Sequence, residues 1–327
     1  MTSRISEPID RLTFDAARLM AEHPPIWRDP NKRIVYGISC PAGSVHRGTI
    51  HYTRWPAMPL PQTIDAAAAA RRVEGREGYY DYASVPQAGA GVEWHVNFAD
   101  PYLFVAYGSP LFAQDEMQVA EHPALGALHE TLQSMALPTV TQEDDRPTPV
   151  LVTGVERRCR VTPQALYGNA FARAAPEAVR RATTPIDPPT ITNLIAMAAP
   201  AGGFGRYRAG TIERILTTAF TGFRAAALES ARHHGERRPI LVHTGFWGCG
   251  AFGGNRVLMS LLQILAAEMA GVERLVFHTG GRGSGDNLRT AIDLIKGDLA
   301  TAGGMKARNL IDQIAGLGFD WGVSDGN

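Results

Sequence analysis

Residues 243–255, HTGFWGCGAFGGN, hold five glycines between two apolar segments. The segment that ends at residue 243 is short and rich in β-branched residues, as a buried strand is, and residues 255–270 have the apolar spacing of a helix. Glycine lets the backbone approach a ligand closely, and a helix start offers unpaired N–H groups and the positive end of its dipole. The stretch therefore predicts a strand, a loop and a helix that together bind an anionic group, with phosphate as the natural ligand.

Other kinds of glycine-rich loop compete for the same residues. Gly248, Gly250 and Gly253 spell the G-x-G-x-x-G pattern of dinucleotide-binding loops. However, this loop is too long for the tight turn of such loops, and Glu273 begins the next strand where an acidic residue should end it. No Gly-Lys-Ser/Thr follows, which excludes a Walker loop. A nicotinamide oxidoreductase is thus a hypothesis of third rank for the function of the protein. For the loop itself, the alternative to a phosphate site is a glycine-rich turn that binds no ligand.

Strands and helices alternate along the chain. Strands are expected at 92–98, 150–155, 191–199, 239–243 and 273–278, and helices at 122–135, 211–233, 255–270, 286–295 and 306–317. Such alternation is typical of an α/β layered domain with a largely parallel sheet. Residues 4–23 and 63–72 are also expected to be helical, with seven prolines between them. We therefore predict a mostly helical accessory segment over 1–90, packed on a main domain over 91–327.

Composition narrows the functional class. The 327 residues carry 32 Lys or Arg and 32 Asp or Glu, so no net positive field exists for coating nucleic acid or binding an anionic membrane. Cys40, Cys159 and Cys249 lie far apart, which argues against a disulfide framework and fits a reducing compartment. No apolar run approaches the ~20 residues of a membrane span, and the N-terminus lacks the apolar core of a signal peptide. We predict a cytoplasmic globular protein without nucleic-acid or membrane partners.

The glycine loop and its helix resemble those of a known family. Residues 244–254, TGFWGCGAFGG, followed by 256–267, RVLMSLLQILAA, are similar to the signature loop and helix of poly(ADP-ribose) glycohydrolases, which hydrolyse glycosidic bonds of ADP-ribose. Residues 212–223 and 96–116 resemble two further family segments, so the resemblance covers about residues 90–280. It implies a macrodomain-like three-layer α/β/α fold with a mixed central sheet, and ADP-ribose or an ADP-ribosylated protein as the partner.

Gln114, Asp115 and Glu116 form the candidate catalytic group. Adjacent carboxylates repel, so one of them tends to have a raised pKa when the pair is partly buried, which suits a general acid for a departing sugar substituent. A polar surface turn is the alternative interpretation. By resemblance, Glu116 donates a proton to the leaving group and then activates water, Asp115 positions the ribose, and Gln114 lies near the nucleoside end. Asn97 and Asp100 correspond to two polar residues that the family carries upstream in the opposite order. By resemblance, Asn97 is expected to bind the ligand, and Asp100 is expected beside the ribose and leaving group.

The resemblance also implies the ligand-binding residues. The diphosphate is expected on the loop from Gly248 to Gly254, and Phe252 is expected to orient the ribose from below. Tyr207 lies where the family places an aromatic residue near the adenine. The predicted loop residues are Gly248, Gly250, Ala251, Phe252, Gly253 and Gly254. The histidines show no HExxH motif or paired ligand spacing, so no metal site and no cofactor are predicted.

The sequence departs from the family near the catalytic group. The family has three consecutive glycines where this chain has Phe104, Val105 and Ala106, so we expect side chains to narrow or reshape the pocket. Asp115 is one methylene shorter than the family's glutamate, and Thr279 replaces a phenylalanine. These changes favour a different specificity for the glycosidic linkage that is hydrolysed, such as the linkage of ADP-ribose to arginine. A guanidinium leaving group suits a pocket lined by acidic side chains. Two main hypotheses remain: an ADP-ribosyl glycohydrolase acting on protein mono-ADP-ribose or poly(ADP-ribose), and an ADP-ribose-binding module that has lost hydrolysis.

Overall fold

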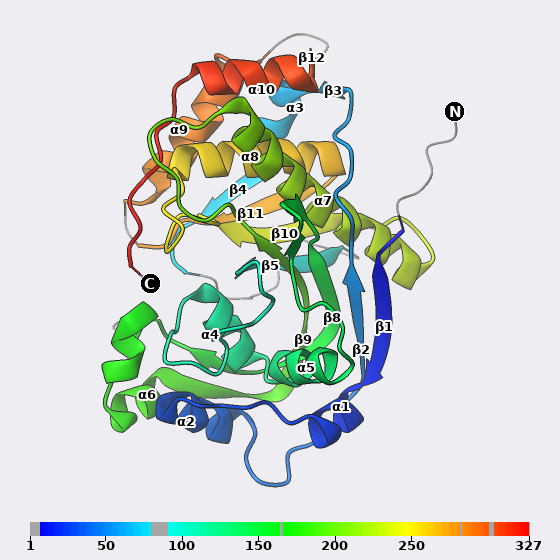
Figure 1. The fold of residues 1–327 in the computed structure, drawn as a ribbon, viewed down its shortest axis with the longest axis vertical. Helices are drawn as coiled ribbons and strands as arrows, with labels where there is room; N and C mark the ends of the chain where they lie inside the picture. The colour runs from blue at the N-terminus through cyan, green and yellow to red at the C-terminus, as the bar shows by residue number, and fades with distance from the viewer. Residues whose placement is uncertain (1–6, 80–90, 164–165, 282, 301–303, 327) are drawn as a thin grey trace.

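In the part of the chain that the structure describes, a mixed eight-stranded sheet forms the middle layer (Figure 1). The computed structural model describes residues 7–79, 91–163, 166–281, 283–300 and 304–326. The strands run in the order β1-β2-β8-β9-β5-β10-β11-β4. Their bounds are β1 Asp10–Asp15, β2 Thr49–Arg54, β4 Val73–Arg76, β5 Val92–Ala99, β8 Val150–Val161, β9 Thr183–Ala198, β10 Ile240–Gly245 and β11 Arg274–His278. Two short pairs lie outside this sheet: β3 Thr63–Ile64 with β12 Met305–Lys306, and β6 Gln142–Glu143 with β7 Arg146–Pro147.

The sheet is parallel on one side and antiparallel on the other. From β9 through β5, β10 and β11 to β4 every neighbouring pair is parallel, whereas β1, β2, β8 and β9 pair antiparallel. Strand β10 is buried at every residue, as parallel strands covered on both faces are. The carboxyl ends of β5, β10 and β11 therefore lie together at the same end of the parallel strands. Open α/β sheets bind ligands at this end.

Helices cover both faces of the sheet, which confirms the predicted three-layer α/β/α fold (Figure 1). One face carries α3 Ala66–Ala69, η1 Ala70–Arg72, α7 Ala209–His234, α8 Arg256–Ala270, α9 Gly285–Lys296 and α10 Ala307–Gly316. The other carries α1 Ala16–Glu22, α2 Pro30–Ser39, α4 Gln114–Glu121, α5 Ala124–Ser134, η2 Gly168–Arg173 and α6 Pro176–Ala182. Alternation along β9 fills both cores: Ile195 and Met197 pack under the first set of helices, and Leu194 and Ala196 under the second.

Residues before 91 contribute to the sheet as well as to its cover. β1 and β2 form one side of the sheet and β4 its other edge. The helix predicted over 4–23 is wrong at residues 10–15, which form β1, and α1 begins only after Asp15, whose side chain accepts a hydrogen bond from Arg18 N at 2.8 Å. Leu12 and Phe14 pack on the core with the two-residue period of a strand, and this burial outweighs the helical spacing. The division into two parts at residue 90 stays a prediction.

Most other predicted elements are present. The helices α5, α7, α8, α9 and α10 and the strands β5, β10 and β11 match the expected ranges within a few residues. β8 and β9 are longer than predicted because they pair with each other far beyond their central residues. The alanine-rich helix expected over 63–72 divides into β3, α3 and η1, since Ile64 pairs with Met305 of β12.

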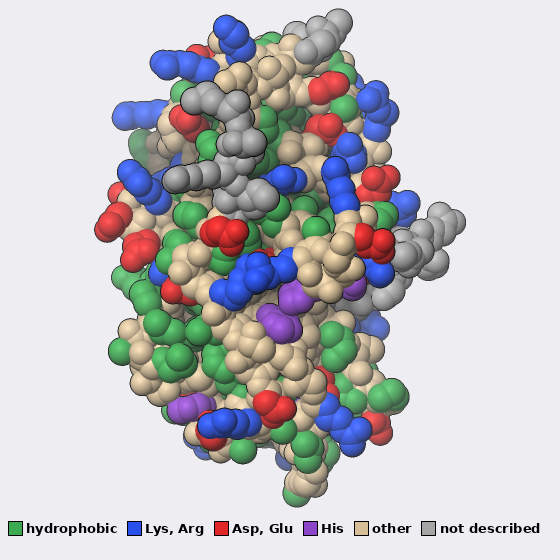
Figure 2. Space-filling view, turned by 90° about the vertical axis from the view of Figure 1, so that its right-hand side faces the viewer, with side chains coloured by type: hydrophobic (Ala, Val, Ile, Leu, Met, Phe, Trp, Pro, Cys, Tyr) green, Lys and Arg blue, Asp and Glu red, His purple; other side chains and the backbone are tan. Residues whose placement is uncertain are grey.

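The described surface is mixed in character. Figure 2 shows side chains of both charge signs interspersed on one face, in keeping with a formal net charge of zero. Among the described residues, no helix combines the length and the apolar character needed to cross a bilayer.

Candidate active site

A cavity of about 550 Å³ lies where β5, β10 and β11 end. Its wall includes the start of α4, the loop between β10 and α8, the residues after β11, and Tyr167 just before η2. The predicted residues that line it are Asp100, Gln114, Asp115, Glu116, Gly248, Gly250, Ala251 and Phe252. The fold thus brings the candidate acids and the glycine loop, far apart in the chain, to one cavity.

Gln114 ties α4 to β5. Its Oε1 accepts a hydrogen bond from Phe98 N at 2.7 Å, and its Nε2 donates to Val96 O at 3.1 Å. At the same helix start, Glu116 Oε2 accepts a hydrogen bond from Ala113 N at 3.0 Å. These bonds give Gln114 a structural role, which is to fix the first turn of α4 against the end of the strand.

Asp115 and Glu116, the acid pair, are buried at the start of α4 with 6% and 4% of their surfaces exposed. Asp115 Oδ1 accepts a hydrogen bond from Asn97 Nδ2 at 3.0 Å, and Asn97 is itself fully buried, so it holds the acid from behind. Burial raises the pKa of Asp115 well above its usual range, and the charge of Glu116 raises it further. Burial also raises the pKa of Glu116. A carboxyl group with a raised pKa holds its proton closer to neutral pH, as a general acid must.

Lys32 is a residue of this site that the sequence did not indicate. It lies on α2, its side chain is fully buried, and its Nζ donates hydrogen bonds to Tyr107 O at 2.6 Å and to Ala106 O at 3.3 Å. Its positive charge lowers the pKa of Glu116 and so opposes the effect of burial. Burial in turn lowers the pKa of Lys32 to about 8. Only the packing of α2 against α4 brings these side chains together, so no local sequence pattern could have linked them.

The loop between β10 and α8 needs its glycines for both space and backbone angle. A Cβ atom at Gly248 would lie 2.4 Å from Ala199 Cβ, and one at Gly254 would lie 2.6 Å from Gly248 O. Gly248 and Gly253 also have positive φ angles of 73° and 64°. Gly253 and Gly254 therefore shape the loop, while Gly248 both shapes it and lines the cavity.

Three side chains anchor this loop. Trp247 is fully buried, and its Nε1 donates a hydrogen bond to Met197 O at 2.9 Å. Asn255 caps α8, because its Oδ1 accepts hydrogen bonds from Val257 N and Leu258 N, each at 3.1 Å. Tyr207 OH accepts a hydrogen bond from Asn255 N at 3.1 Å, and its ring stacks on Trp321 at a centroid distance of 4.1 Å. This position does not support the predicted stacking of Tyr207 on adenine, since the ring is buried and lies outside the cavity wall.

The three residues at the family's glycine positions do not narrow the cavity. Phe104, Val105 and Ala106 lie outside its wall, and Phe104 is fully buried in the core under α1, α2 and α5. The φ angle of Phe104 is 56°, a left-handed conformation that glycine adopts at little cost. The expectation of a narrowed pocket is therefore wrong, because the backbone at this turn directs the Phe104 side chain into the core.

Acidic side chains gather in the part of the cavity that α4 forms. Asp100 joins the acid pair there, and Glu121 also reaches the wall. Arg256 lies on the opposite side, at the first position of α8 beside the glycine loop. Asp325 lies next to the same loop, with its backbone N donating to Gly250 O at 3.4 Å. Near the loop an anionic ligand would therefore meet the Arg256 guanidinium but also the Asp325 carboxylate, and near α4 a cationic group would meet carboxylates.

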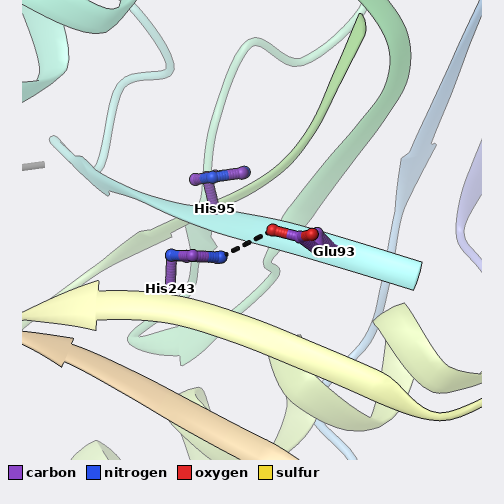
Figure 3. Close-up of side chains that lie close together, drawn as sticks. All are labelled: Glu93, His95 and His243. Carbon is purple, nitrogen blue, oxygen red and sulfur yellow. Dashed lines mark hydrogen bonds and ion pairs between the residues drawn. The ribbon is translucent and has the colours of Figure 1, made fainter. Parts of the chain in front are cut away.

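Glu93, His95 and His243 form a polar cluster on β5 and β10 (Figure 3). One ligand atom of each lies within 4.8 Å of the others, which makes this the candidate metal site among the described residues. However, the two imidazole rings stack at 4.4 Å with 11° between their planes. Because the lone pair of an imidazole nitrogen lies in the ring plane, two stacked rings cannot both point at one ion. The sequence signal for the cluster is the i, i+2 spacing of Glu93 and His95, which places both on one face of a strand.

A hydrogen-bonded chain describes the same cluster better. His243 Nε2 donates to Glu93 Oε2 at 2.9 Å, and His243 Nδ1 lies 3.2 Å from His278 Nε2. His278 lies in the cavity wall, so this chain connects the start of β5 with the cavity. The chain thus runs across the three neighbouring strands β5, β10 and β11.

Comparison with known proteins places these features in a family. The model of the family described as poly (ADP-ribose) glycohydrolase (PARG), macro domain fold, matches residues 93–286. A relative named "Probable poly(ADP-ribose) glycohydrolase 2", from Arabidopsis thaliana, is 26% identical over 234 residues, which cover 61% of this chain and 42% of the plant protein. The match therefore spans less than half of the length of that relative.

Solved structures of the family are also similar. Poly(ADP-ribose) glycohydrolase from Thermomonospora curvata, bound to the inhibitor ADP-HPD, has 16% identity and a TM-score of 0.46 over 84% of this chain and 98% of its own. The enzyme from Deinococcus radiodurans in complex with ADP-ribose has 14% identity and a TM-score of 0.39 over 70% of this chain and 90% of its own. With the family model covering more than half of its residues, the chain belongs to the poly(ADP-ribose) glycohydrolase family, which has the macro domain fold.

Proposed function

We propose that this protein is an ADP-ribosyl glycohydrolase, which hydrolyses the bond between the ribose of ADP-ribose and the group that carries it. The observation that carries this proposal is the meeting of a buried Glu116 and the glycine loop in one cavity. The glycine loop and Arg256 form one part of the cavity wall, where a diphosphate can bind, and the start of α4 presents a carboxyl group for proton transfer. Membership of the family supports the same ligand.

Glu116 is the general acid and then the general base of the proposed reaction. It begins protonated and donates its proton to the leaving atom as the bond from the anomeric carbon to that atom breaks. The Glu116 carboxylate then takes a proton from water, whose oxygen forms the new bond to the anomeric carbon. The products are ADP-ribose and the protonated leaving group, and Glu116 ends in its starting state. Asp115, held by Asn97, orients the ribose, and Asp100 faces the leaving group.

We propose an arginine-linked protein conjugate as the preferred substrate. Asp100 and the acid pair would surround a guanidinium leaving group with carboxylates, whereas the neutral ribose at the end of a polymer gains nothing from them. Matched preparations of arginine-linked mono-ADP-ribose and of poly(ADP-ribose) test this preference. Faster turnover of the polymer would contradict the proposed linkage and leave the reaction type standing.

Release of free ADP-ribose from a modified protein tests the reaction itself. We expect the wild type to release ADP-ribose and also to bind it, as measured by calorimetry. Binding without release from any conjugate would favour the second candidate function, an ADP-ribose-binding module that lacks hydrolysis. Tight binding of NADH without binding of ADP-ribose would contradict both.

A further inference from the structure

Lys32 connects the N-terminal part of the chain to the acid pair. Its side chain has no exposed surface, and its ammonium group donates hydrogen bonds to Tyr107 O at 2.6 Å and to Ala106 O at 3.3 Å. Lysine is almost never fully buried unless its charge is compensated. Backbone carbonyls supply part of that compensation, and the remainder must come from charges nearby.

The packing of α2 holds Lys32 in place. Asp29 caps this helix and accepts hydrogen bonds from Asn31 N at 2.9 Å and Lys32 N at 3.1 Å. Asn31 Nδ2 donates to Phe171 O at 2.8 Å, which fixes α2 against η2. The Lys32 ammonium also lies 5.8 Å from the centre of the Phe112 ring. The two carbonyl groups use the ammonium as a hydrogen-bond donor, but neutral carbonyls do not balance its full charge.

The acid pair supplies the balancing charge. The charges of Glu116, Asp115 and Asp29 all raise the pKa of Lys32 against the opposing effect of burial. Reciprocally, the Lys32 charge lowers the pKa values of Asp115 and Glu116, which burial raises. The geometry agrees with these charge effects, because α2 packs against α4 and the Lys32 ammonium lies 5.8 Å from the ring centre of Phe112, two residues before α4 begins.

We propose that Lys32 is a positioning residue of this site, which fixes the turn at residues 104–107 and stabilises the ionised form of Glu116 from beneath α4. This inference rests on the proposed function, because a general acid that must also act as a base has to be able to release its proton. Without the cation, burial would leave Glu116 protonated and slow the step in which it activates water. With the cation, the carboxyl group can alternate between its two states.

Several other titratable or charged groups lie around Lys32, the acid pair and the cavity, and the test must hold them constant. They are Asp29 before α2, Asp100 after β5, Tyr167 before η2, Asp325 in the C-terminal segment, and the ion pair of Glu121 on α4 with Arg157 on β8. All of these groups are unchanged when Lys32 alone is substituted. A change in the titration of the acid pair is then attributable to Lys32.

Carboxyl ¹³C NMR titration of the full chain tests the proposal without requiring activity. We compare the wild type with Lys32→Met, Lys32→Arg and the exposed control Lys296→Met, and assign the signals with Glu116→Gln and Asp115→Asn. Lys32→Met should raise the apparent pKa of the pair by about 1–3 units, the range for loss of an opposite charge close by. Lys32→Arg keeps the charge and should restore most of the shift, while Lys296→Met should change nothing.

The pH profile of ADP-ribose release provides the second measurement. The alkaline limb of kcat/KM should move to higher pH in Lys32→Met and return toward the wild-type position in Lys32→Arg. A titration of the acid pair that is the same with and without the Lys32 charge overturns the inference, even if Lys32→Met is less stable. Failure of the proposed function is distinct, because the wild type would then release no ADP-ribose while the NMR titration still reports on Lys32. If Lys32→Met does not fold, Lys32→Gln, which keeps a donor for Tyr107 O, replaces it in both measurements.

Discussion

Glu116 and Asp115 are neighbours in the chain, yet their side chains have different hydrogen-bond partners. Asp115 accepts a hydrogen bond from Asn97 and is held against β5. Glu116 accepts a hydrogen bond from Ala113 N and faces the charge of Lys32. The hydrogen bond from Asn97 fixes the position of Asp115, as the proposed orientation of the ribose requires. Glu116 can gain and lose a proton, as the proposed proton transfer requires.

Asp115→Asn should stabilise the protein at neutral pH. The folded-state pKa of Asp115 lies above the unfolded value, so ionisation at neutral pH costs the folded state free energy. We expect a gain of about 1–2 kcal/mol in the free energy of unfolding, because Asn97 and Lys32 offset only part of the cost of burying this carboxylate. The gain should be absent below the unfolded pKa and grow as pH rises through the folded one. Urea unfolding from acid to neutral pH measures it, and an equal effect at every pH would contradict this sign.

The glycine loop is the element on which the proposed ligand binding depends. Its strand, β10, is buried, its helix starts at the Asn255 cap, and Trp247 fixes its middle. The turn at residues 104–107 is the opposite case, because Phe104 keeps the left-handed backbone of a glycine position and buries its side chain away from the ligand. The three side chains at 104–106 therefore lie outside the cavity wall.

Gly254→Ala should weaken both the loop and ADP-ribose binding. The new Cβ would lie 2.6 Å from Gly248 O, a backbone atom that can move only if the loop moves. We expect a loss of about 2 kcal/mol in stability and a clear rise in the Kd for ADP-ribose. Gly210→Ala on α7, where no atom lies within 4 Å, is the matched control and should leave the Kd unchanged. Wild-type affinity in Gly254→Ala would show that the loop does not contact the ligand.

At the scale of the whole molecule, residues 7–79 contribute three strands to the macro domain sheet. β1 and β2 extend it next to β8, and β4 pairs with β11 at the other edge. The same segment carries Lys32 to the acid pair. The described structure therefore joins the N-terminal residues to the site through both sheet pairing and charge.

Expression of residues 91–327 alone tests that integration. The fragment lacks β1, β2 and β4, so β8 and β11 would expose unpaired edges, and it also lacks Lys32. We expect an aggregating or poorly folded product by circular dichroism and gel filtration, beside a full-length control. A folded, monomeric fragment that binds ADP-ribose would instead support the division at residue 90 predicted from the sequence.

Local patterns in the sequence were enough to predict the glycine loop and the elements around it. The Asn255 cap, the apolar strand before the loop and the glycines all act over a few residues, so their consequences can be read from the chain. Lys32, Tyr207 and Phe104 could not be placed this way, because their roles depend on contacts between distant elements. β1 was mistaken for a helix since its apolar residues fit both periods, and only pairing with β2 decides between them.

A comparison of ADP-ribose release by the wild type and by Glu116→Gln tests the central claim most directly. The change removes the ionisable group and keeps the size of the side chain, and Glu213→Gln on the exposed face of α7 is the control. With arginine-linked substrate at saturation, we predict a rate reduced by about 100-fold or more in Glu116→Gln, the lower end of the range for general acid–base catalysis. The Kd for ADP-ribose should stay within a few-fold of the wild type. Release at the wild-type rate by folded Glu116→Gln protein would contradict the account.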